Sequence, residues 1–184
     1  QALEINHEVI PILNKIDLPA SDIEKTKTEI EDVVGIETTN AISCSGKTGE
    51  GIDEILEAIV NKLPSPEGKL DEKLKCLLVD SWYDSYLGVV ILVRVINGKL
   101  KKNMKVKLMS NNKEYLIEKV GVFTPKPNDI GELNPGEIGF IITGIKSLSE
   151  TKVGDTICDA NNPIKIPLPG FKPSKPVVFC GLFP

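Results

Sequence analysis

Residues 42–51 read ISCSGKTGEG and contain Gly46-Lys47-Thr48, the ending of a phosphate-binding loop, G-x-x-x-x-G-K-[ST]. In such a loop flexible glycines let consecutive backbone amides curl around a phosphate, while the lysine contacts phosphates and the hydroxyl contacts Mg²⁺. The pattern requires a glycine five residues before Gly46, and the chain has Ala41 there. Because the match fails where backbone freedom matters most, the stretch is either an ordinary glycine-rich turn or a different part of a nucleotide site.

A second polar set, NKID, spans residues 14–17 and ends an apolar run at 9–15 that is typical of a buried parallel strand. Ser45-Gly46-Lys47 likewise ends a predicted strand at 40–45. Neighbouring parallel strands bring their carboxyl ends to one edge of an open sheet, where such sheets bind ligands. We therefore expect the two loops to lie together.

The side chains at this edge suit a guanine base. The Asp17 carboxylate can accept hydrogen bonds from both the N1–H and the amino group of guanine, whereas adenine presents an acceptor at N1. A site built around such a pair rejects the wrong partner by roughly 10⁴-fold. Taken alone, N-K-x-D also fits a strand end whose Asp17 caps the following turn, and it is the pairing with Ser45-Gly46-Lys47 that favours a base site.

Two helices must position these loops. Ser21 and Glu24 form an S-x-x-E capping box, and the helix that they open is expected to end at Gly35. A second helix follows the Ser45 loop and ends before Pro64. Strands that alternate with helices indicate a doubly wound α/β sheet. Since two strands cannot form that sheet alone, and the chain starts at Gln1 without Met, we expect an internal piece of a longer protein.

After residue 63 the pattern changes. A polar, proline-containing stretch at 64–73 is predicted to be a linker, and residues 161–184 are predicted to be a connector and the start of a third domain. Between them, short β runs separated by turns favour a small antiparallel β-barrel over residues 74–160. The predicted strands cover residues 74–80, 88–96, 104–109, 114–123 and 137–144.

Composition excludes several function classes. The net charge is −4, and no apolar run is long enough to cross a bilayer. The four cysteines lack metal-ligand spacing and are expected to be reduced, buried thiols in a cytosolic protein. His7 is the only histidine, and we expect it at the surface rather than in catalysis. Neither a metal site nor a catalytic residue is therefore predicted within this chain.

The NKID and SGK loops together resemble the base-recognition half of the GTPase superfamily, its N-K-x-D motif and its S-A-K loop. By this resemblance Asn14 would bond the other edge of the purine, and the Lys15 and Lys47 stems would cover its two faces. Ser45 would steady Asp17, and the Gly46 amide would donate to the guanine oxygen. The family usually has alanine where Gly46 stands, but a backbone contact survives that difference.

A GTPase domain followed by a small barrel resembles translation factors, and three stretches of this chain are most similar to the elongation factor 4 (LepA) family. They are LPSPEGKLDEKLKCLLVDSWYDSYLGVV at 63–90, VGVFTPKPND at 120–129 and LPGFKPSKPVVFCGLFP at 168–184. The resemblance implies a monomeric, ribosome-dependent GTP hydrolase that acts during elongation and promotes backward movement of tRNAs. It also implies a cytoplasmic or organellar protein, with peripheral contact to the cytoplasmic side of the inner membrane in part of the family.

The parts that perform hydrolysis are not in this sequence. Phosphoryl transfer requires a phosphate cradle, Mg²⁺ and a positioned water. The chain contains neither a complete phosphate loop nor a D-x-x-G stretch followed by histidine. We therefore expect GTP and GDP as ligands of the parent protein, Mg²⁺ only together with the missing phosphate-binding part, and no hydrolysis by this piece alone.

An alternative from another class is a non-enzymatic module whose barrel binds RNA or the ribosome beside a vestigial α/β segment. Residues 94–126 hold 9 Lys and Arg against 2 Glu, which suits a phosphate backbone. A solvated face explains the same excess. The contact residues of such a module would be Lys99, Lys101, Lys102, Lys105 and Lys107.

Overall fold

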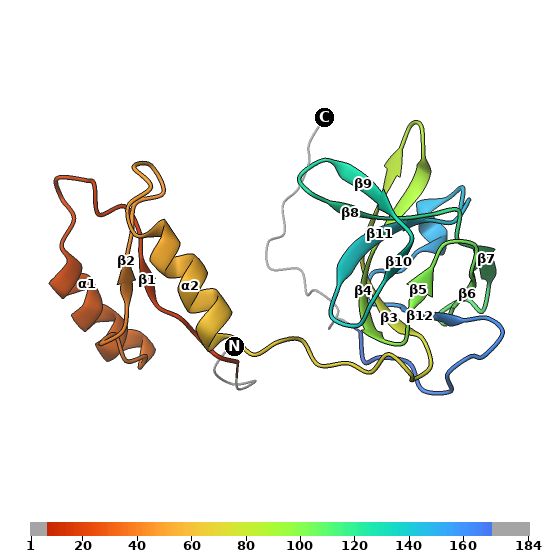
Figure 1. The fold of residues 1–184 in the computed structure, drawn as a ribbon, viewed down its shortest axis with the longest axis horizontal. Helices are drawn as coiled ribbons and strands as arrows, with labels where there is room; N and C mark the ends of the chain where they lie inside the picture. The colour runs from red at the N-terminus through yellow and green to blue at the C-terminus, as the bar shows by residue number, and fades with distance from the viewer. Residues whose placement is uncertain (1–6, 171–184) are drawn as a thin grey trace, which may run out of the picture. The chain divides into compact units, whose positions relative to one another are not determined.

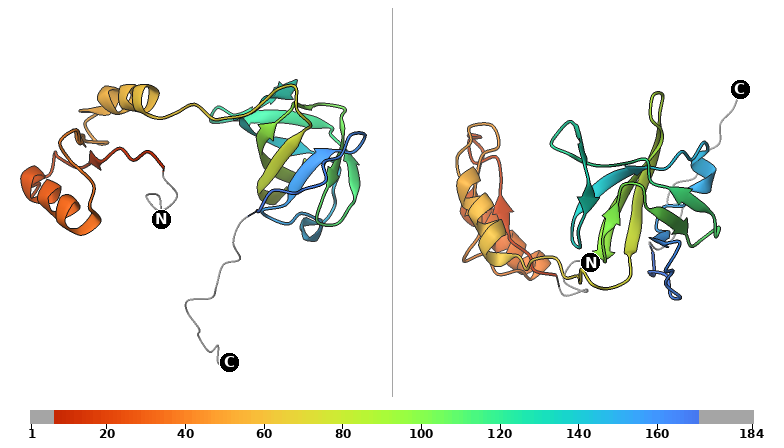
Figure 2. Two further views of the ribbon diagram at one scale, coloured as in Figure 1. Left: turned by 90° about the horizontal axis from the view of Figure 1, so that it is seen from below. Right: turned by 45° about the vertical axis from the view of Figure 1, so that its right-hand side comes forward.

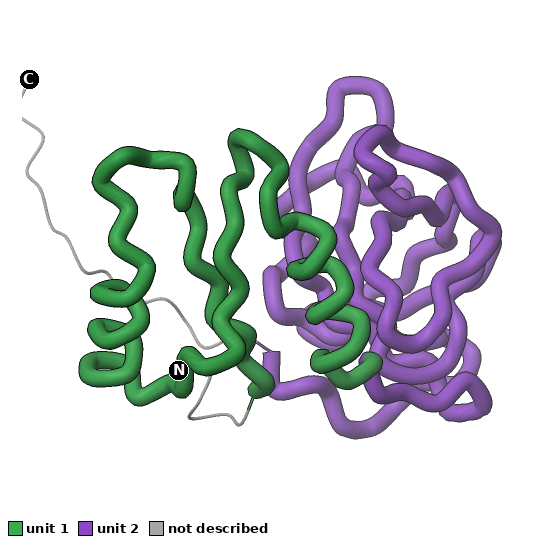
Figure 3. Tube along the Cα trace, turned by 60° about the vertical axis from the view of Figure 1, so that its left-hand side comes forward, with its two compact units in different colours: residues 1–65 green, residues 66–184 purple. Residues whose placement is uncertain are grey.

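The computed structural model describes residues 7–170, and the chain divides into two compact units, Gln1–Ser65 and Pro66–Pro184 (Figure 3). Helices dominate the first unit and strands dominate the second. An α/β segment followed by a β-barrel is thus confirmed as the fold.

The first unit is a short parallel strand pair with a helix to either side (Figures 1 and 3). Ile12 pairs with Ile42, and Leu13 with Ser43, so both strands end at one edge of the pair, as expected. The elements are β1 (Ile12–Leu13), α1 (Ile23–Glu29), the π-helical turn η2 (Ile30–Val34), β2 (Ile42–Ser43) and α2 (Ile52–Lys62).

The predicted capping box at the start of α1 is wrong by one residue. Asp22 is the N-cap, and its side chain accepts a hydrogen bond from Lys25 N at 3.0 Å. Ser21 instead donates its N–H to Leu18 O at 3.0 Å, so it belongs to the preceding turn. The end is as predicted, because Gly35 closes η2 with a φ of 72°.

The second unit is a strongly bent antiparallel sheet with the strand order β7-β6-β12-β3-β4-β11-β8-β9, plus the pair β10-β5 (Figures 1 and 2). Its long hairpin joins β3 to β4 and supplies six of the sixteen buried side chains of the main core cluster. The strands are β3 (Lys75–Asp84), β4 (Gly88–Asn97), β5 (Leu100–Lys101), β6 (Lys105–Leu108), β7 (Glu114–Leu116), β8 (Lys119–Phe123), β9 (Pro127–Ile130), β10 (Glu132–Leu133), β11 (Ile138–Ile142) and β12 (Thr156–Asp159).

The strand predicted at 114–123 is two strands. The chain changes partners at its middle, because Ile117 N donates to Met104 O whereas Glu118 N donates to Ile142 O. The predicted set also lacked β5, β9, β10 and β12. β9 begins at Pro127 and lies at an edge of the sheet, where a proline removes no needed hydrogen bond.

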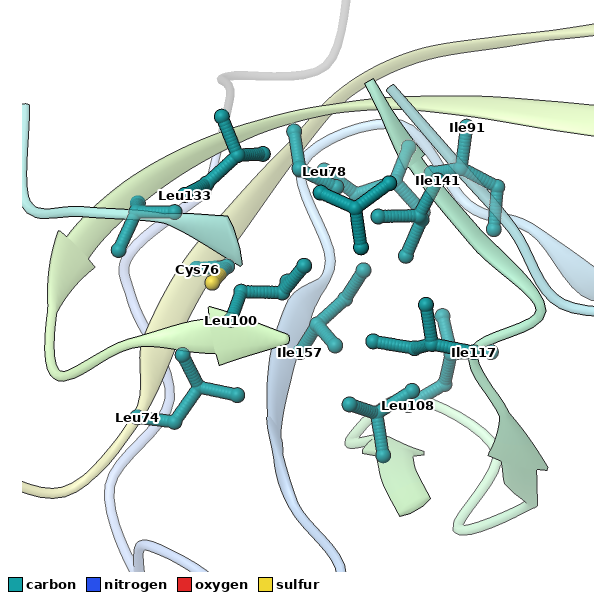
Figure 4. Close-up of a cluster of buried hydrophobic side chains, with 14 of the residues drawn as sticks. Leu74, Cys76, Leu78, Ile91, Leu100, Leu108, Ile117, Leu133, Ile141 and Ile157 are labelled. Carbon is teal, nitrogen blue, oxygen red and sulfur yellow. The ribbon is translucent and has the colours of Figure 1, made fainter. Parts of the chain in front are cut away.

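Inward-facing aliphatic side chains from all parts of the barrel form one core (Figure 4). Cys76 lies in this core, and burial raises the pKa of its thiol. Cys44, Cys76 and Cys158 are free and buried, as expected for reduced thiols, while Cys180 lies outside the described residues. The core members labelled in Figure 4 include Leu78, Ile91, Leu100, Leu108, Ile117, Leu133, Ile141 and Ile157.

Residues 66–72 are bonded to the barrel, and we call this segment the strap. Gly98 N donates to Lys69 O at 2.8 Å, and Lys69 N donates to the Asn97 side chain at 3.2 Å. Asn97 in turn donates to Glu72 at 2.5 Å. The Asn97-Gly98 turn after β4 therefore anchors the segment that joins α2 to β3.

Two glycines let the strap approach the barrel closely. A Cβ added to Gly68 would lie 2.4 Å from Ile96 O, and one added to Gly136 would lie 2.7 Å from Pro66 Cβ. Neither position can hold a larger residue unless the strap moves. The proposed third domain begins in the segment 161–184, of which residues 171–184 lie outside the described part of the chain.

Candidate nucleotide-base site

The two polar loops lie side by side at the carboxyl edge of the β1–β2 pair. Cys44 N donates to Leu13 O at 2.8 Å, and Ile16 N donates to Cys44 O at 3.3 Å, so the strand pairing continues into both loops. This edge is where the sequence places Asn14 to Asp17 and Ser45 to Lys47.

Asn14 connects the two loops through one atom. Its Oδ1 accepts hydrogen bonds from Lys15 N at 2.7 Å, from Gly46 N at 3.1 Å and from Cys44 Sγ at 3.7 Å. Lys15 adopts a left-handed backbone with a φ of 71°, which is uncommon outside glycine. The turn at the start of the NKID loop is therefore specified by the Asn14 side chain.

Ser45 and Asp17 form the second link. Ser45 is fully buried, and its Oγ donates to Asp17 Oδ1 at 2.7 Å while accepting from Thr48 N at 3.2 Å. Within residues 7–170 no hydrogen bond reaches Asp17 Oδ2. The carboxylate is thus held by one oxygen and offers the other as an acceptor.

A pocket of about 370 Å³ opens between the loops. The residues around it are Asn14, Lys15, Asp17, Leu18, Gly46 and Lys47. Five of the six site residues expected from the sequence line this pocket, and the sixth, Ser45, lies behind Asp17. Leu18 was not expected, and its place directly after Asp17 was the only signal for it. Lys15 and Lys47 are exposed, and each of the two loops contributes one of them to the lining of the pocket.

The Ser45 loop uses its own amides internally. Ser45 N donates to Glu50 O, Gly49 N to Ser45 O, and Thr48 N to Ser45 Oγ. Gly46 N is taken by Asn14 Oδ1. A phosphate cradle needs several of these N–H groups pointing outward at one anion. The arrangement therefore argues against the phosphate-loop interpretation of Gly46-Lys47-Thr48.

Gly46 is not required by space. A Cβ there would lie 3.9 Å from Asn14 Oδ1, which is an ordinary van der Waals contact, and its φ is not left-handed. The alanine expected at this position from the GTPase resemblance would therefore fit without rearrangement. For the same reason, the glycine does not alter the pocket.

Several basic residues of the barrel are paired with acids. Lys99 and Lys101 contact Glu132 at 3.1 and 3.2 Å, and Lys105 contacts Glu114 at 2.7 Å. These ammonium groups lower the pKa of both carboxyls through hydrogen bonds. Three of the five lysines of the RNA-binding alternative thus contact a carboxylate, with Lys99 and Lys101 sharing that of Glu132, which weakens the case for a phosphate-binding stripe.

No group of three or more His, Cys, Asp or Glu side chains is arranged to hold a metal ion in the described residues. None of the helices between residues 7 and 170 combines the length and the apolar character that a bilayer span requires. His7 is exposed and lies outside any helix or strand.

A parallel strand pair with polar loops at its carboxyl edge, followed by a bent antiparallel barrel, defines an α/β segment joined to a β domain. Residues 1–65 match the family described as Elongation factor Tu GTP binding domain. Residues 88–158 match Elongation factor Tu domain 2. The chain is therefore built from domains of the elongation factor Tu family of translational GTPases: part of a GTP-binding domain and a domain 2.

Solved structures of selenocysteine-related elongation factors share this fold. Translation elongation factor SelB from Methanococcus maripaludis, in its apo form, has a TM-score of 0.66 at 16% identity, over 88% of this chain and 35% of that one. Its complex with the GTP analogue GppNHp has a TM-score of 0.68 at 18% identity, over 88% and 36%. A bacterial selenocysteine-specific elongation factor has a TM-score of 0.61 at 16% identity, over 82% and 26%. The chain thus spans about a third or less of the length of these structures.

Proposed function

We propose that the first unit recognises the guanine base of GTP or GDP for a larger translational GTPase. The main support is a pair of hydrogen bonds at the strand edge, from Ser45 to Asp17 and from Gly46 to Asn14. They connect the two loops beside a pocket that both loops line. These links fix a carboxylate acceptor, Asp17, and a carboxamide, Asn14, in the lining of one pocket.

In this proposal Asp17 accepts the N1–H and amino group of guanine, and Asn14 bonds the opposite edge of the purine. Ser45 orients Asp17 without touching the base. The aliphatic stems of Lys15 and Lys47 cover the two ring faces. The Gly46 amide, now donated to Asn14, is the nearest donor for the guanine oxygen and would share or exchange its acceptor when the base binds.

The rest of GTP has no built site in the described residues. The loop amides are used internally, and no group of three or more His, Cys, Asp or Glu side chains between residues 7 and 170 is arranged to hold Mg²⁺. The phosphates, Mg²⁺ and the hydrolytic water would therefore depend on chain outside this sequence, and this piece alone is expected not to hydrolyse GTP. Bound Mg²⁺ would neutralise phosphate charge there.

For the whole protein we infer an elongation factor 4 (LepA) type of GTPase. The support is the sequence resemblance at 63–90, 120–129 and 168–184, together with the match to both elongation factor Tu domains. This assignment gives the ribosome and tRNA as partners, a monomer, and a cytoplasmic or organellar location, with membrane contact resting on the resemblance alone. The selenocysteine-related elongation factors share the fold, so a factor of that type is the competing assignment.

The base proposal is tested by exchanging Asp17 for Asn. Xanthine has a carbonyl oxygen where guanine has its amino group, so an asparagine can accept from N1–H and donate to that oxygen. We expect the wild-type chain to bind GDP with a dissociation constant on the order of 1 mM, followed by the backbone amide signals of Lys15 and Gly46 in NMR titrations. Asp17→Asn should prefer XDP over GDP by at least tenfold, and neither protein should respond to ADP.

The matched control is Asp53→Asn, which removes an exposed carboxylate from the first turn of α2 outside the pocket. It should bind GDP like the wild type. Equal responses of the wild type to GDP and ADP would contradict guanine recognition, and so would an Asp17→Asn variant that retains its GDP preference.

The finer assignment needs the complete protein. An elongation factor 4 type enzyme should hydrolyse GTP with ribosomes and no aminoacyl-tRNA, and should move the toeprint of a post-translocation ribosome back by one codon. A strict requirement for an aminoacyl-tRNA complex would favour the delivery-type factors instead. The coding sequence before Gln1 should contain a G-x-x-x-x-G-K-[ST] loop and a D-x-x-G-H stretch within roughly 150 residues.

A further inference from the structure

The side-chain oxygen of Asn14 is surrounded by donors from three sources. Lys15 N and Gly46 N approach it from the two loops, and Cys44 Sγ approaches it from the end of β2. A carbonyl oxygen has two lone pairs, so its acceptor capacity is used within the protein. The reversed carboxamide would place its NH₂ against these donors. The amide group of Asn14 that remains available to a ligand is therefore Nδ2, a donor.

Cys44 differs from the other two donors because its side chain supplies the contact. The residue is 3% exposed, and its backbone is fixed by bonds to Leu13 O and from Ile16 N. Its thiol contacts the Asn14 carboxamide, and Cys44 is not among the six residues that line the pocket. Cys44 therefore acts on a ligand through Asn14 rather than by touching it.

The backbone of Gly51 lies in close contact with Cys44. It precedes α2 with a φ of 73°, and a Cβ there would lie 3.1 Å from both Cα and Cβ of Cys44 and 2.2 Å from Ser43 O. The start of α2 can approach the end of β2 this closely only with glycine at this position. The cysteine is thus in close contact with the helix start through its Cα and Cβ and with the Asn14 side chain through its thiol.

We propose that Cys44 is a positioning residue of the base site: its thiol, held by Gly51, sets the Asn14 carboxamide so that the NH₂ faces the purine. This inference rests on the proposed guanine site and adds a residue that the motif does not contain. The inference predicts one particular hydrogen bond to the ligand. The Asn14 NH₂ would donate to an acceptor on the purine edge opposite Asp17, and on guanine that edge carries N7.

The test compares GDP with 7-deaza-GDP, which has a C–H in place of N7. We expect the wild-type chain to prefer GDP by about five- to tenfold, which corresponds to one hydrogen bond. Cys44→Ala removes the thiol donor and should reduce that preference to about twofold. Cys44→Ser restores a donor on a shorter side chain and should retain a preference between those of the wild type and the alanine variant.

The ratio of the two affinities separates positioning from folding. A variant that only loosens the unit weakens both ligands equally and leaves the ratio unchanged, and protection of the Ile42 and Cys44 amides checks the strand pair. A Cys44→Ala variant that retains the full preference would overturn the inference while leaving guanine binding intact. Cys44→Ser falling to the alanine value would also overturn it, since packing alone would then matter. A wild type that binds neither nucleotide would overturn the proposed function, and the inference with it.

Discussion

The hydroxyl of Tyr115 on β7 bonds the 3₁₀-helix η3 (Leu148–Glu150) to the barrel. Its hydroxyl donates to Glu150 Oε2 at 2.7 Å, and Lys113 pairs with the same carboxylate. Burial, followed by the hydrogen bond to Glu150 and its negative charge, raises the pKa of Tyr115 to about 12. The ordinary value is 10.0. The folded protein therefore keeps a proton on Tyr115 where the unfolded chain loses it.

This difference predicts a loss of stability in alkali. The contribution of Tyr115 is fully present below pH 10 and is lost as the pH rises from 10 toward about 12. Tyr115→Phe removes the bond and should cost about 1 kcal/mol at neutral pH. Urea unfolding at pH 8 and pH 11 measures both effects. The gap between wild type and Tyr115→Phe should shrink at pH 11, and a constant gap would contradict the raised pKa.

At this scale the sequence predicts the site through residue type and spacing. That Asn14, Asp17 and Ser45 lie together could be predicted, because each follows one of two neighbouring parallel strands. Cys44 and Gly51 could not, because their role depends on a side-chain approach that no spacing encodes. The sequence also does not show that the loop amides are bonded internally. For this reason the sequence alone could not exclude a phosphate loop at Gly46-Lys47-Thr48.

Among the elements of the fold, the strap is the segment whose contacts the sequence predicts least well. Its proline, glycine and charged residues are those of a flexible linker, and a linker is what they predict. Its anchors are the Asn97-Gly98 turn and the backbone at Ile96, which lie far along the chain. The same limit explains the missed strands β5 and β10, whose two residues each are specified only by the partner strand.

Gly68→Ala tests the strap. The added methyl would meet Ile96 O at 2.4 Å, so the segment must shift, at a cost of roughly 1–3 kcal/mol to the barrel. Trypsin should then cleave after Lys69 several times faster than in the wild type. Gly131→Ala is the control, because a Cβ at Gly131 meets nothing within 4 Å. Equal cleavage rates for Gly68→Ala and Gly131→Ala would show that the strap is not held by this contact.

At the scale of the whole chain the two units differ in how much apolar surface they bury. In the described part of the first unit the buried apolar residues are Leu13, Cys44 and Ala58, whereas Val60 on α2 is 76% exposed. The second unit buries a continuous core across its strands. The sequence pattern of α2 predicts its helix correctly but not this exposure, since periodicity reports which face is apolar and not what covers it.

We therefore expect the units to unfold separately. Trp82 is the only tryptophan and lies in β3, so its fluorescence reports the barrel, while circular dichroism at 222 nm reports α1 and α2. The unfolding midpoint measured by circular dichroism should lie at a urea concentration lower than the fluorescence midpoint by on the order of 1 M. Amides of β1 and β2 should also exchange faster than those of β4. Coincident midpoints would mean that one cooperative transition covers both units.

The Ser45 loop has a kinetic consequence. Its amides are bonded within the two loops, Ser45 N to Glu50 O, Gly49 N to Ser45 O and Gly46 N to Asn14 Oδ1, and only the last of these bonds is expected to change when a base binds. In the proposed base site, an incoming base would meet a largely preformed surface, so binding would cost little conformational entropy and would require no folding step. Association should then approach the diffusion-controlled regime, and differences in affinity between bases should reside in how long each one stays.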